Sequence, residues 1–338
     1  MLENLLTVAA QVLMLFIMIL VGFLCGKTKI LKSDAIKGLT DLVLYVATPA
    51  AILQSFTSED CTTEKTLNLL YVFLAALAIH IITILLTALL IKHKNADSRR
   101  VMRFAVIFSN CGYMSFPLQK AILGDIGVFY GAMFVAVFNI VLWTYGAFLA
   151  SGDKKSISPK KILLNPTILS VIISVVLYLL RIKLPVFVSG AVTGLGNLNT
   201  PLPMIIIGYS LSTFNLKELF TDKRVYWPTV MRLILIPAIS LALMALFGIS
   251  GIPLIACTVA ASAPVAAVTV MFATKYGLDS ALGSKIISLS TILSILTMPV
   301  FVGTNNIKQS PTKKGGALVL FRNYFILAAH ISTKCFGN

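Results

Sequence analysis

The sequence predicts an all-α integral membrane protein with ten transmembrane helices, arranged as two inverted five-helix repeats in which helices 4 and 9 are broken. Three observations lead to this prediction: an apolar composition, ten long apolar runs, and a one-sided distribution of basic residues between the runs. Of the 338 residues, 58% are hydrophobic and only 12% are charged, and the mean hydropathy is +0.93. Soluble domains carry about 25% charged residues. This chain therefore has too few charges to cover a surface that faces water.

Ten apolar runs are each long enough to cross a bilayer, which takes about 20 helical residues. In chain order they cover 5–25, 38–56, 67–91, 101–123, 126–150, 162–181, 186–212, 225–247, 252–274 and 280–302. The first run is preceded by Glu3 and followed by 26–29 (GKTK), without a small-residue cleavage site. It therefore differs from a secretory signal peptide, and we expect it to be retained as the first span.

Basic residues between the runs predict the orientation in the membrane. Eighteen Lys and Arg lie in, or within a few residues of, the loops after odd-numbered runs, and only four lie in or near the loops after even-numbered runs. Because cytoplasmic loops carry the excess of Lys and Arg, we expect the odd-numbered loops to be cytoplasmic and both termini to be outside. The net charge of +16 is thus explained by topology and anionic headgroups, and it does not indicate nucleic-acid binding.

The short loop at 151–161 divides the ten runs into two sets of five. An odd number of spans per half places the halves in opposite orientations, which is a common plan for secondary transporters. We therefore expect a first repeat at 1–150, a cytoplasmic linker at 151–161 and an inverted second repeat at 162–302. The basic tail at 303–338 lies outside this scheme, because its apolar stretch of about 15 residues is too short to span a bilayer.

Prolines and small polar residues interrupt four runs at places that correspond between the halves. The second and seventh runs are interrupted at 47–50 (ATPA) and 199–203 (NTPLP), and the fourth and ninth at 109–117 (SNCGYMSFP) and 261–264 (ASAP). Backbone groups freed by a break are costly in hydrocarbon, so a break persists only where protein or a watery cavity satisfies them. A mere proline kink is the alternative for any single run, but the matched positions favour functional breaks.

The breaks in the fourth and ninth runs predict an anion-binding site. Pro117 suits the first position of a new half-helix, and Pro264 suits the same role from the opposite side. Each break then places a helix N-terminus, with its partial positive charge, near the bilayer midplane. Two such ends can hold an anion without any full charge. The expected substrate-binding residues are Asn110, Gly112, Tyr113, Pro117, Asn139, Pro49, Pro201, Ser262 and Pro264.

Few ionisable residues lie inside the runs, and Asn139 is a polar residue midway along the fifth run. Asn139 either binds substrate or forms a structural hydrogen bond between helices, and the sequence favours neither role. Arg232 is expected to snorkel to the cytoplasmic side, with direct substrate binding as the alternative. His80 has no evident carboxylate partner and is interpreted as a packing residue. The runs contain no pair of carboxylates, which argues against cation coupling through buried Asp or Glu.

Enzyme and metal-site motifs are missing from the sequence. The chain has no G-x-x-x-x-G-K-[ST], H-E-x-x-H or G-x-S-x-G motif, and its loops are too short for a catalytic domain. Its five cysteines show no C-x-x-C spacing, so they are interpreted as free thiols. We therefore expect no enzymatic activity, no metal and no cofactor.

Four features follow one another in a characteristic order: 45–50 (YVATPA), 109–118 (SNCGYMSFPL), Arg232 with Pro237, and 263–264 (AP) with 273–279 (ATKYGLD). Together they resemble the auxin efflux carrier family over about residues 5–302. Members commonly carry an N-x-G-x-x-x-x-P break in the fourth span, which Asn110, Gly112 and Pro117 match. The resemblance implies that the broken spans 4 and 9 cross and that substrate binds beside the crossing.

The resemblance also implies a substrate class. Plant members export the weak acid auxin, whereas bacterial relatives are linked to dicarboxylates such as malonate or malate. The short central loop resembles prokaryotic-type members. The leading hypothesis is a secondary carrier in the cell (plasma) membrane that moves a small organic anion by alternating access.

Two other hypotheses stay open at this point. One is a sodium- or proton-coupled symporter or antiporter of the bile-acid-transporter type, and the other is a membrane receptor that binds without transporting. The expected partners are the lipid bilayer and the organic anion, with no nucleic acid. A coupling proton or sodium ion and a homodimer are left open.

Overall fold

The computed structural model describes residues 2–213 and 221–303, which fold into helices joined by short loops, with no strand among them. The all-α prediction is confirmed for this part of the chain. Six of the described helical segments are long and apolar enough to cross a membrane: Ala9–Lys27, Ser33–Ser58, Thr63–Leu90, Asp125–Ser151, Lys223–Leu246 and Ser280–Gly303. The other four predicted spans contain shorter helices. Residues 304–338 of the predicted tail lie outside the described residues.

The helices of the predicted first half are α1 (Leu2–Lys27), α2 (Ser33–Leu42), α3 (Thr48–Ser58), α4 (Thr63–Leu90), α5 (Ala96–Ile107), α6 (Ser115–Leu123), α7 (Asp125–Val141) and α8 (Ala147–Ser151). Two π-helical turns join some of them without a break: η1 (Val43–Ala47) links α2 to α3, and η2 (Leu142–Gly146) links α7 to α8. Side-chain caps begin two of the helices, since Thr62 accepts from the backbone N–H of Lys65 and Asn95 accepts from that of Ser98.

The predicted linker and second half contain η3 (Lys154–Ser156), α9 (Pro159–Leu163), α10 (Pro166–Leu179), α11 (Val186–Asn197), α12 (Pro201–Ser212), η4 (Lys223–Val225), α14 (Tyr226–Val230), η5 (Met231–Leu235), α15 (Ile236–Leu246), α16 (Gly251–Ser262), α17 (Val268–Lys275) and α18 (Ser280–Gly303). Here η5 is a π-helical turn that joins α14 to α15 without a break. Pro166 and Pro201 begin α10 and α12, where a proline leaves no helical hydrogen bond unmade.

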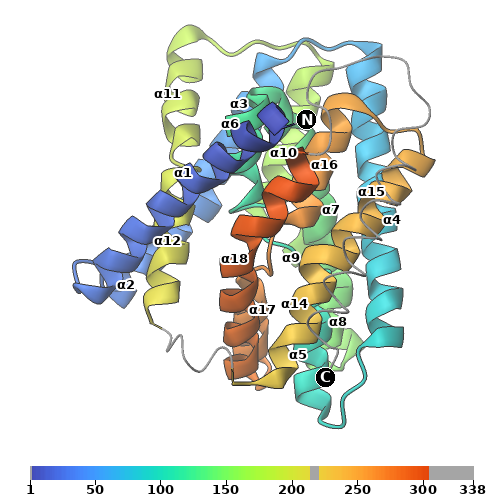
Figure 1. Cartoon of the computed structure of the whole chain (residues 1–338). Helices are drawn as coiled ribbons and strands as arrows, with labels where there is room; N and C mark the ends of the chain where they lie inside the picture. Colours follow the sequence, from blue (N-terminus) through green and yellow to red (C-terminus); the bar gives the residue numbers. More distant parts are fainter. Residues whose placement is uncertain (1, 214–220, 304–338) are drawn as a thin grey trace.

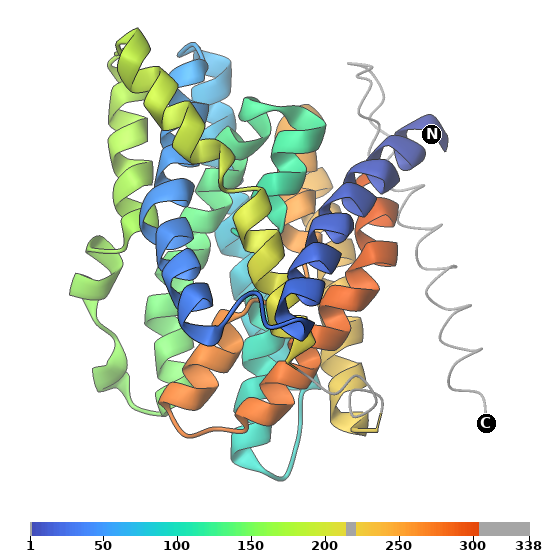
Figure 2. The ribbon, with the colours of Figure 1, turned by 90° about the vertical axis from the view of Figure 1, so that its left-hand side faces the viewer.

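The helices pack around α7, which is buried along most of its length (Figures 1 and 2). Helices α3, α4, α6, α10 and α16 contact it. Helix α1 crosses the assembly obliquely and packs on α12 and α18. The contact between α1 and α12 is backbone to backbone, because a Cβ at Gly22 would lie 2.7 Å from the Cα of Ile205.

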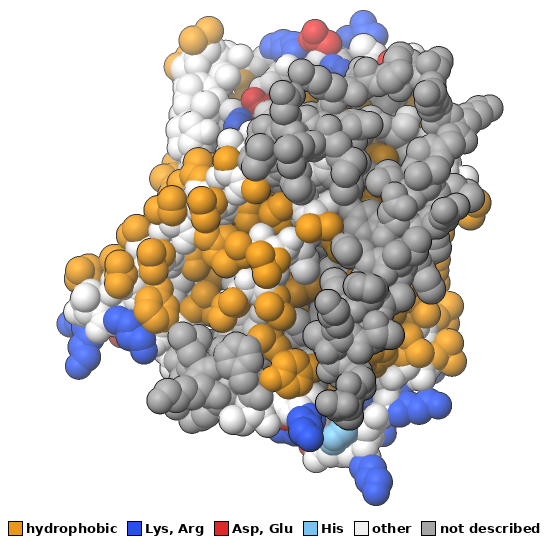
Figure 3. All heavy atoms as spheres, in the orientation of Figure 1, with side chains coloured by type: hydrophobic (Ala, Val, Ile, Leu, Met, Phe, Trp, Pro, Cys, Tyr) orange, Lys and Arg blue, Asp and Glu red, His pale blue; other side chains and the backbone are white. Residues whose placement is uncertain are grey.

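The outer surface carries an apolar belt. Hydrophobic side chains cover the middle of the face drawn in Figure 3, and Lys and Arg lie towards its two ends. Large exposed residues such as Leu13 on α1, Leu85 on α4 and Ile173 on α10 belong to this apolar surface. A soluble protein rarely exposes so much contiguous apolar area. The molecule is therefore a multi-pass membrane protein, as its composition predicts.

The predicted interruptions differ in kind. The fourth, seventh and ninth runs are broken, at 108–114, 198–200 and 263–267. The second run is not broken, because η1 absorbs one extra residue and the chain continues helically through Thr48 and Pro49 into α3. The prediction of a break at 47–50 is therefore wrong. Its proline lies in the first turn of α3, where no backbone hydrogen bond is lost.

Candidate functional site

The breaks in the fourth and ninth runs contact each other through their backbones. The N–H of Asn110 donates to the carbonyl of Pro264 at 2.7 Å, and the N–H of Ala266 donates to the carbonyl of Phe108 at 3.0 Å. Between these bonds, Ser109 and Val265 form an antiparallel bridge. The two breaks thus satisfy each other's polar groups, as buried backbone requires. We call segments 108–114 and 263–267 the crossover.

Proline chemistry explains where α16 ends. The residue before a proline is pushed out of the α region, and Ala263, with φ −60° and ψ 146°, is extended. Pro264 therefore lies inside the break, and α17 begins four residues later at Val268. Pro117 is the third residue of α6, since that helix begins at Ser115. The prediction that both prolines open a half-helix is thus wrong in register, although both lie at or beside the crossover.

Arg232 lies on η5 with only 2% of its surface exposed. Its guanidinium donates to the carbonyl of Val106 at 3.0 Å and to the carbonyl of Ala261. Those carbonyls belong to the last turns of α5 and α16, the two helices that end at the crossover. The expectation that Arg232 snorkels is therefore wrong: the side chain points inward and holds two negative helix ends together.

The opposite ends at the crossover are the N-termini of α6 and α17. Each carries a hydroxyl in its first turn, Ser115 on α6 and Thr269 on α17. Both residues are buried, and neither hydroxyl oxygen has a hydrogen-bond partner within residues 2–213 and 221–303. The sequence analysis missed these two residues as binding groups, although a hydroxyl just after each break was the available signal. Buried polar atoms are rarely left unpaired, which marks both positions as candidates for contact with a ligand.

Open space lies beside the crossover at Gly112. No atom lies within 4 Å of the place where a Cβ would be at this residue. Asn110 is 8% exposed, and its carboxamide has no hydrogen-bond partner in the described part of the chain. Tyr113 follows in the same turn and is half-buried. Asn110, Gly112, Tyr113 and Pro264 are therefore brought together in one place, with room and donors next to it.

Other predicted residues have different surroundings. The hydroxyl of Ser262 donates to the carbonyl of Val259 at 3.2 Å, within its own helix. Asn139 donates to the carbonyl of Val135 at 2.9 Å and accepts from the side chain of Asn165 at 3.2 Å. These bonds tie α7 to the start of α10.

Pro49 and Pro201 lie at a second junction between the halves. Thr48, just before Pro49, donates to the side chain of Asn199, just before α12, at 2.7 Å, and both are buried. Helix α11 and the π-turn η1 also contact here. The second and seventh runs therefore meet, as do the fourth and ninth, but through one unbroken and one broken helix.

The described residues also include a buried histidine and a cavity. The Nδ1–H of His80 donates to the carbonyl of Ala76 at 2.7 Å, and the ring packs against those of Phe134 and Phe138. Within residues 2–213 and 221–303, no three His, Cys, Asp or Glu side chains gather as metal ligands would. A cavity of about 220 Å³ lies between the α3–α4 loop and the end of α10, and Asp60, Tyr178 and Lys183 help to line it. None of its lining residues belongs to the crossover.

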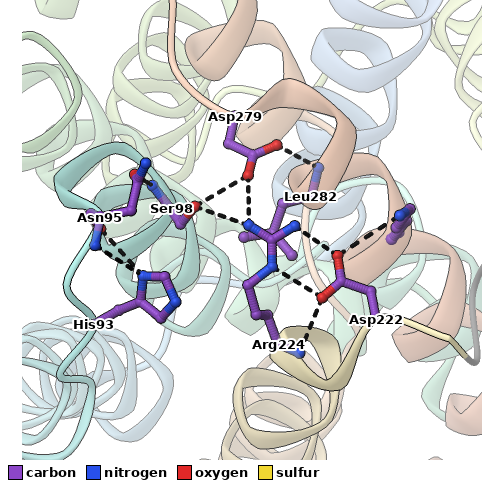
Figure 4. Close-up of polar contacts among 8 residues, drawn as sticks. His93, Asn95, Ser98, Asp222, Arg224, Asp279 and Leu282 are labelled. Atoms are coloured by element: carbon purple, nitrogen blue, oxygen red, sulfur yellow. Dashed lines mark hydrogen bonds and ion pairs between the residues drawn. The ribbon is translucent and has the colours of Figure 1, made fainter.

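An ion-pair cluster ties together helix ends on the side where α5 and η4 begin (Figure 4). Arg224 pairs with Asp222 at 2.7 Å and with Asp279 at 2.9 Å. Ser98 of α5 donates to Asp279 at 3.0 Å, and the carboxylate of Asp279 accepts from the N–H of Leu282 at the start of α18. The predicted fourth, eighth and tenth spans are thus joined at one end.

This cluster predicts an acid-sensitive stability. The Arg224 guanidinium beside Asp222 lowers the pKa of that carboxyl from its ordinary 3.8 to about 2. Because the folded-state pKa is depressed, the stabilisation is complete above about pH 4 and is lost as the pH falls towards 2. We expect Asp222→Asn to lower the melting temperature at neutral pH, with the difference from wild type shrinking across this window. Thermal unfolding in detergent measures it, and Asp34→Asn is the control because the Asp34 side chain is 95% exposed.

Comparisons with known proteins agree with this architecture. Residues 7–302 match the model of a family described as membrane transport protein. A relative named as an uncharacterized transporter of Methanocaldococcus jannaschii is 28% identical over 307 residues, covering 86% of this chain and 96% of the relative. A second uncharacterized transporter, from Methanothermobacter thermautotrophicus, is 23% identical over 295 residues, covering 86% and 96%.

Proposed function

This chain belongs to the membrane transport proteins of the auxin efflux carrier family, and from that premise we propose that it is a secondary carrier of a small organic anion. The coarser assignment, a membrane transporter and not an enzyme, follows from the family. The anionic substrate is our proposal. It is supported by the charges that surround the crossover.

The charge balance at the crossover carries the proposal. Each helix end has roughly half an elementary charge, negative at the C-terminus and positive at the N-terminus. Arg232 offsets the two C-termini, those of α5 and α16, through its bonds to Val106 and Ala261. Neither α6 nor α17 has an acidic residue in its first turn or a side-chain cap. The nearby anionic group is Asp41, whose charge acts on Tyr113 beside the crossover. The two uncapped helix N-termini contribute positive potential there, and this potential favours a carboxylate.

The substrate contacts follow from the residues next to this charge. The free carboxamide of Asn110 can donate to a carboxylate, and the hydroxyls of Ser115 and Thr269 can donate from the two helix N-termini. The space at Gly112 admits the ligand. A dicarboxylate such as malate or malonate carries the charge that such a site favours, and it is the class that the family resemblance implies.

The finer topology belongs to the same proposal. We place ten spans in two inverted repeats, with the odd-numbered loops cytoplasmic, both termini outside, and the protein in the plasma membrane. The positions of α2, α5 and α17, whose flanking loops are basic, towards one end of the molecule support this orientation (Figure 1). Alternating access then moves one part of the bundle past another around the crossover.

Substitution of Asn110 tests the site. A hydrogen bond to a charged group contributes about 1.5–3 kcal/mol, so we expect Asn110→Ala to weaken apparent affinity about ten- to hundredfold. Asn110→Asp keeps the shape but repels an anion, and we expect a larger loss. Uptake of labelled malate or malonate into proteoliposomes measures both. Equal uptake by all three proteins, or better uptake by the Asp variant, would contradict an anion site here.

A bulky side chain at Gly112 separates binding from folding. Because the space around Gly112 is empty, Gly112→Leu is expected to leave the melting temperature within a degree or two while abolishing uptake. Gly38→Leu is the matched control, since Gly38 on α2 is exposed and also has nothing within 4 Å. If Gly112→Leu transports normally, the substrate does not use this space.

A further inference from the structure

The surroundings of Arg232 have the composition of a cation site. Two backbone carbonyls, from Val106 and Ala261, point at one place, and each belongs to the C-terminal turn of a half-helix. Half-helix C-termini and freed carbonyls are the groups that coordinate sodium in transporters with broken helices. In this chain the positive group between the two carbonyls is the guanidinium of Arg232, which is part of the protein itself.

In the described residues, the two carbonyls are the hydrogen-bond partners of the buried Arg232 guanidinium. Arg232 is 2% exposed and forms no ion pair with a carboxylate within residues 2–213 and 221–303. Its Nε also has no partner there. A buried charge is costly unless it is paired. The positive guanidinium and the partial negative charges of the two helix C-termini therefore offset each other.

We propose that Arg232 is a built-in substitute for a coupling cation, and that removing its side chain would leave an empty site that binds a free monovalent cation. A guanidinium does not lose its proton in proteins, so this positive charge is permanent and stays with the protein through the transport cycle. Wild-type transport is therefore independent of sodium. This last statement rests on the proposed carrier function, whereas the cation site itself does not.

The test uses the purified full-length chain without any organic anion. Melting temperatures are measured in equimolar sodium chloride, choline chloride and methylguanidinium chloride, for wild type and for Arg232→Ala, Arg232→Lys and Arg232→Met. Alanine opens the site, lysine keeps a charge in it, and methionine fills it without a charge. Arg103→Ala is the matched control, because Arg103 also donates to carbonyls at a helix end, those of Ala88 and Ile91, but lies nearer the surface.

The expected pattern is specific to a vacated cation site. Arg232→Ala should melt several degrees lower than wild type in choline and recover at least half of that loss in methylguanidinium or sodium. Wild type, Arg232→Lys, Arg232→Met and Arg103→Ala should show no such difference between salts. An Arg residue with a merely structural role would lower the melting temperature equally in all three salts.

Two results would overturn the proposal. One is a folded Arg232→Ala protein whose stability no cation restores, and the other is a wild-type protein that sodium stabilises relative to choline. If Arg232→Ala does not fold, the wild-type comparison and Arg232→Lys still decide the question, since a sodium requirement in either contradicts a permanent internal cation. Malate binding is measured separately, so loss of the anion proposal would leave these readouts unchanged.

Discussion

Replacing Arg232 by methionine is expected to lower the stability of the folded protein by several kcal/mol. The substitution keeps an unbranched side chain of similar length but removes the donors to Val106 and Ala261. A buried acceptor left without a partner costs about 1–3 kcal/mol, and here two are lost together. The two helix C-termini also lose the charge that offsets their repulsion. Thermal or denaturant unfolding in detergent measures the change.

The comparison that makes this result informative is again Arg103. Arg103→Met removes bonds to the carbonyls of Ala88 and Ile91 near the surface, where water can replace them. We expect its effect to stay within about 1 kcal/mol. If Arg232→Met is as mild as Arg103→Met, then Arg232 does not hold α5 and α16 together.

Adding one methyl group at Gly208 is expected to destabilise the contact between α1 and α12. A Cβ at Gly208 would lie 2.7 Å from the backbone nitrogen of Phe23 and closer still to the carbonyl of Ile19. Backbone atoms cannot rotate away as side chains do, so the two helices must separate. Overpacking costs about 1–3 kcal/mol, occasionally more, and we expect Gly208→Ala to lie at the upper end of this range.

Gly190→Ala is the control, because we expect this substitution to leave the stability unchanged or to raise it slightly. Gly190 lies on the exposed surface of α11, with nothing within 4 Å of an added Cβ. Alanine favours a helix over glycine by about 1 kcal/mol, so this variant should be as stable as wild type or slightly more so. The melting temperatures of both variants test this prediction. If Gly208→Ala is as stable as wild type, the backbones of α1 and α12 do not approach as closely as the structure shows.

The crossover shows how far motif reasoning reaches. The polar segment 109–117 and the ASAP sequence at 261–264 predict breaks, because Asn, Gly, Ser and Pro in an apolar run free backbone groups that hydrocarbon cannot satisfy. That the two breaks satisfy each other, through Asn110 with Pro264 and Ala266 with Phe108, is a long-range pairing with no local signal. The contacts of Arg232 also have no local sequence signal, because its partners Val106 and Ala261 lie 126 and 29 residues away along the chain.

The second run shows where motif reasoning fails. The sequence 47–50 (ATPA) has the composition of a break, but the π-turn η1 accommodates it and the helix continues. A proline stops a helix only if its missing N–H or its ring conflicts with the preceding turn. Whether that turn can widen depends on the neighbouring helices, and here Thr48 is held by Asn199 of the seventh run.

By itself the sequence determined the membrane class, the helical architecture and three of the four places where it predicted an interruption, because these depend on local composition and on the length of apolar runs. The tertiary structure decided the rest. It placed Asn110, Gly112 and Tyr113 beside Pro264 and joined Asn139 to Asn165. It buried the hydroxyls of Ser115 and Thr269 without a partner among the described residues, and it directed Arg232 to two helix ends. Charges and hydrogen bonds act over a few ångströms of space, whereas these partners lie far apart along the chain, so only folding brings them within reach.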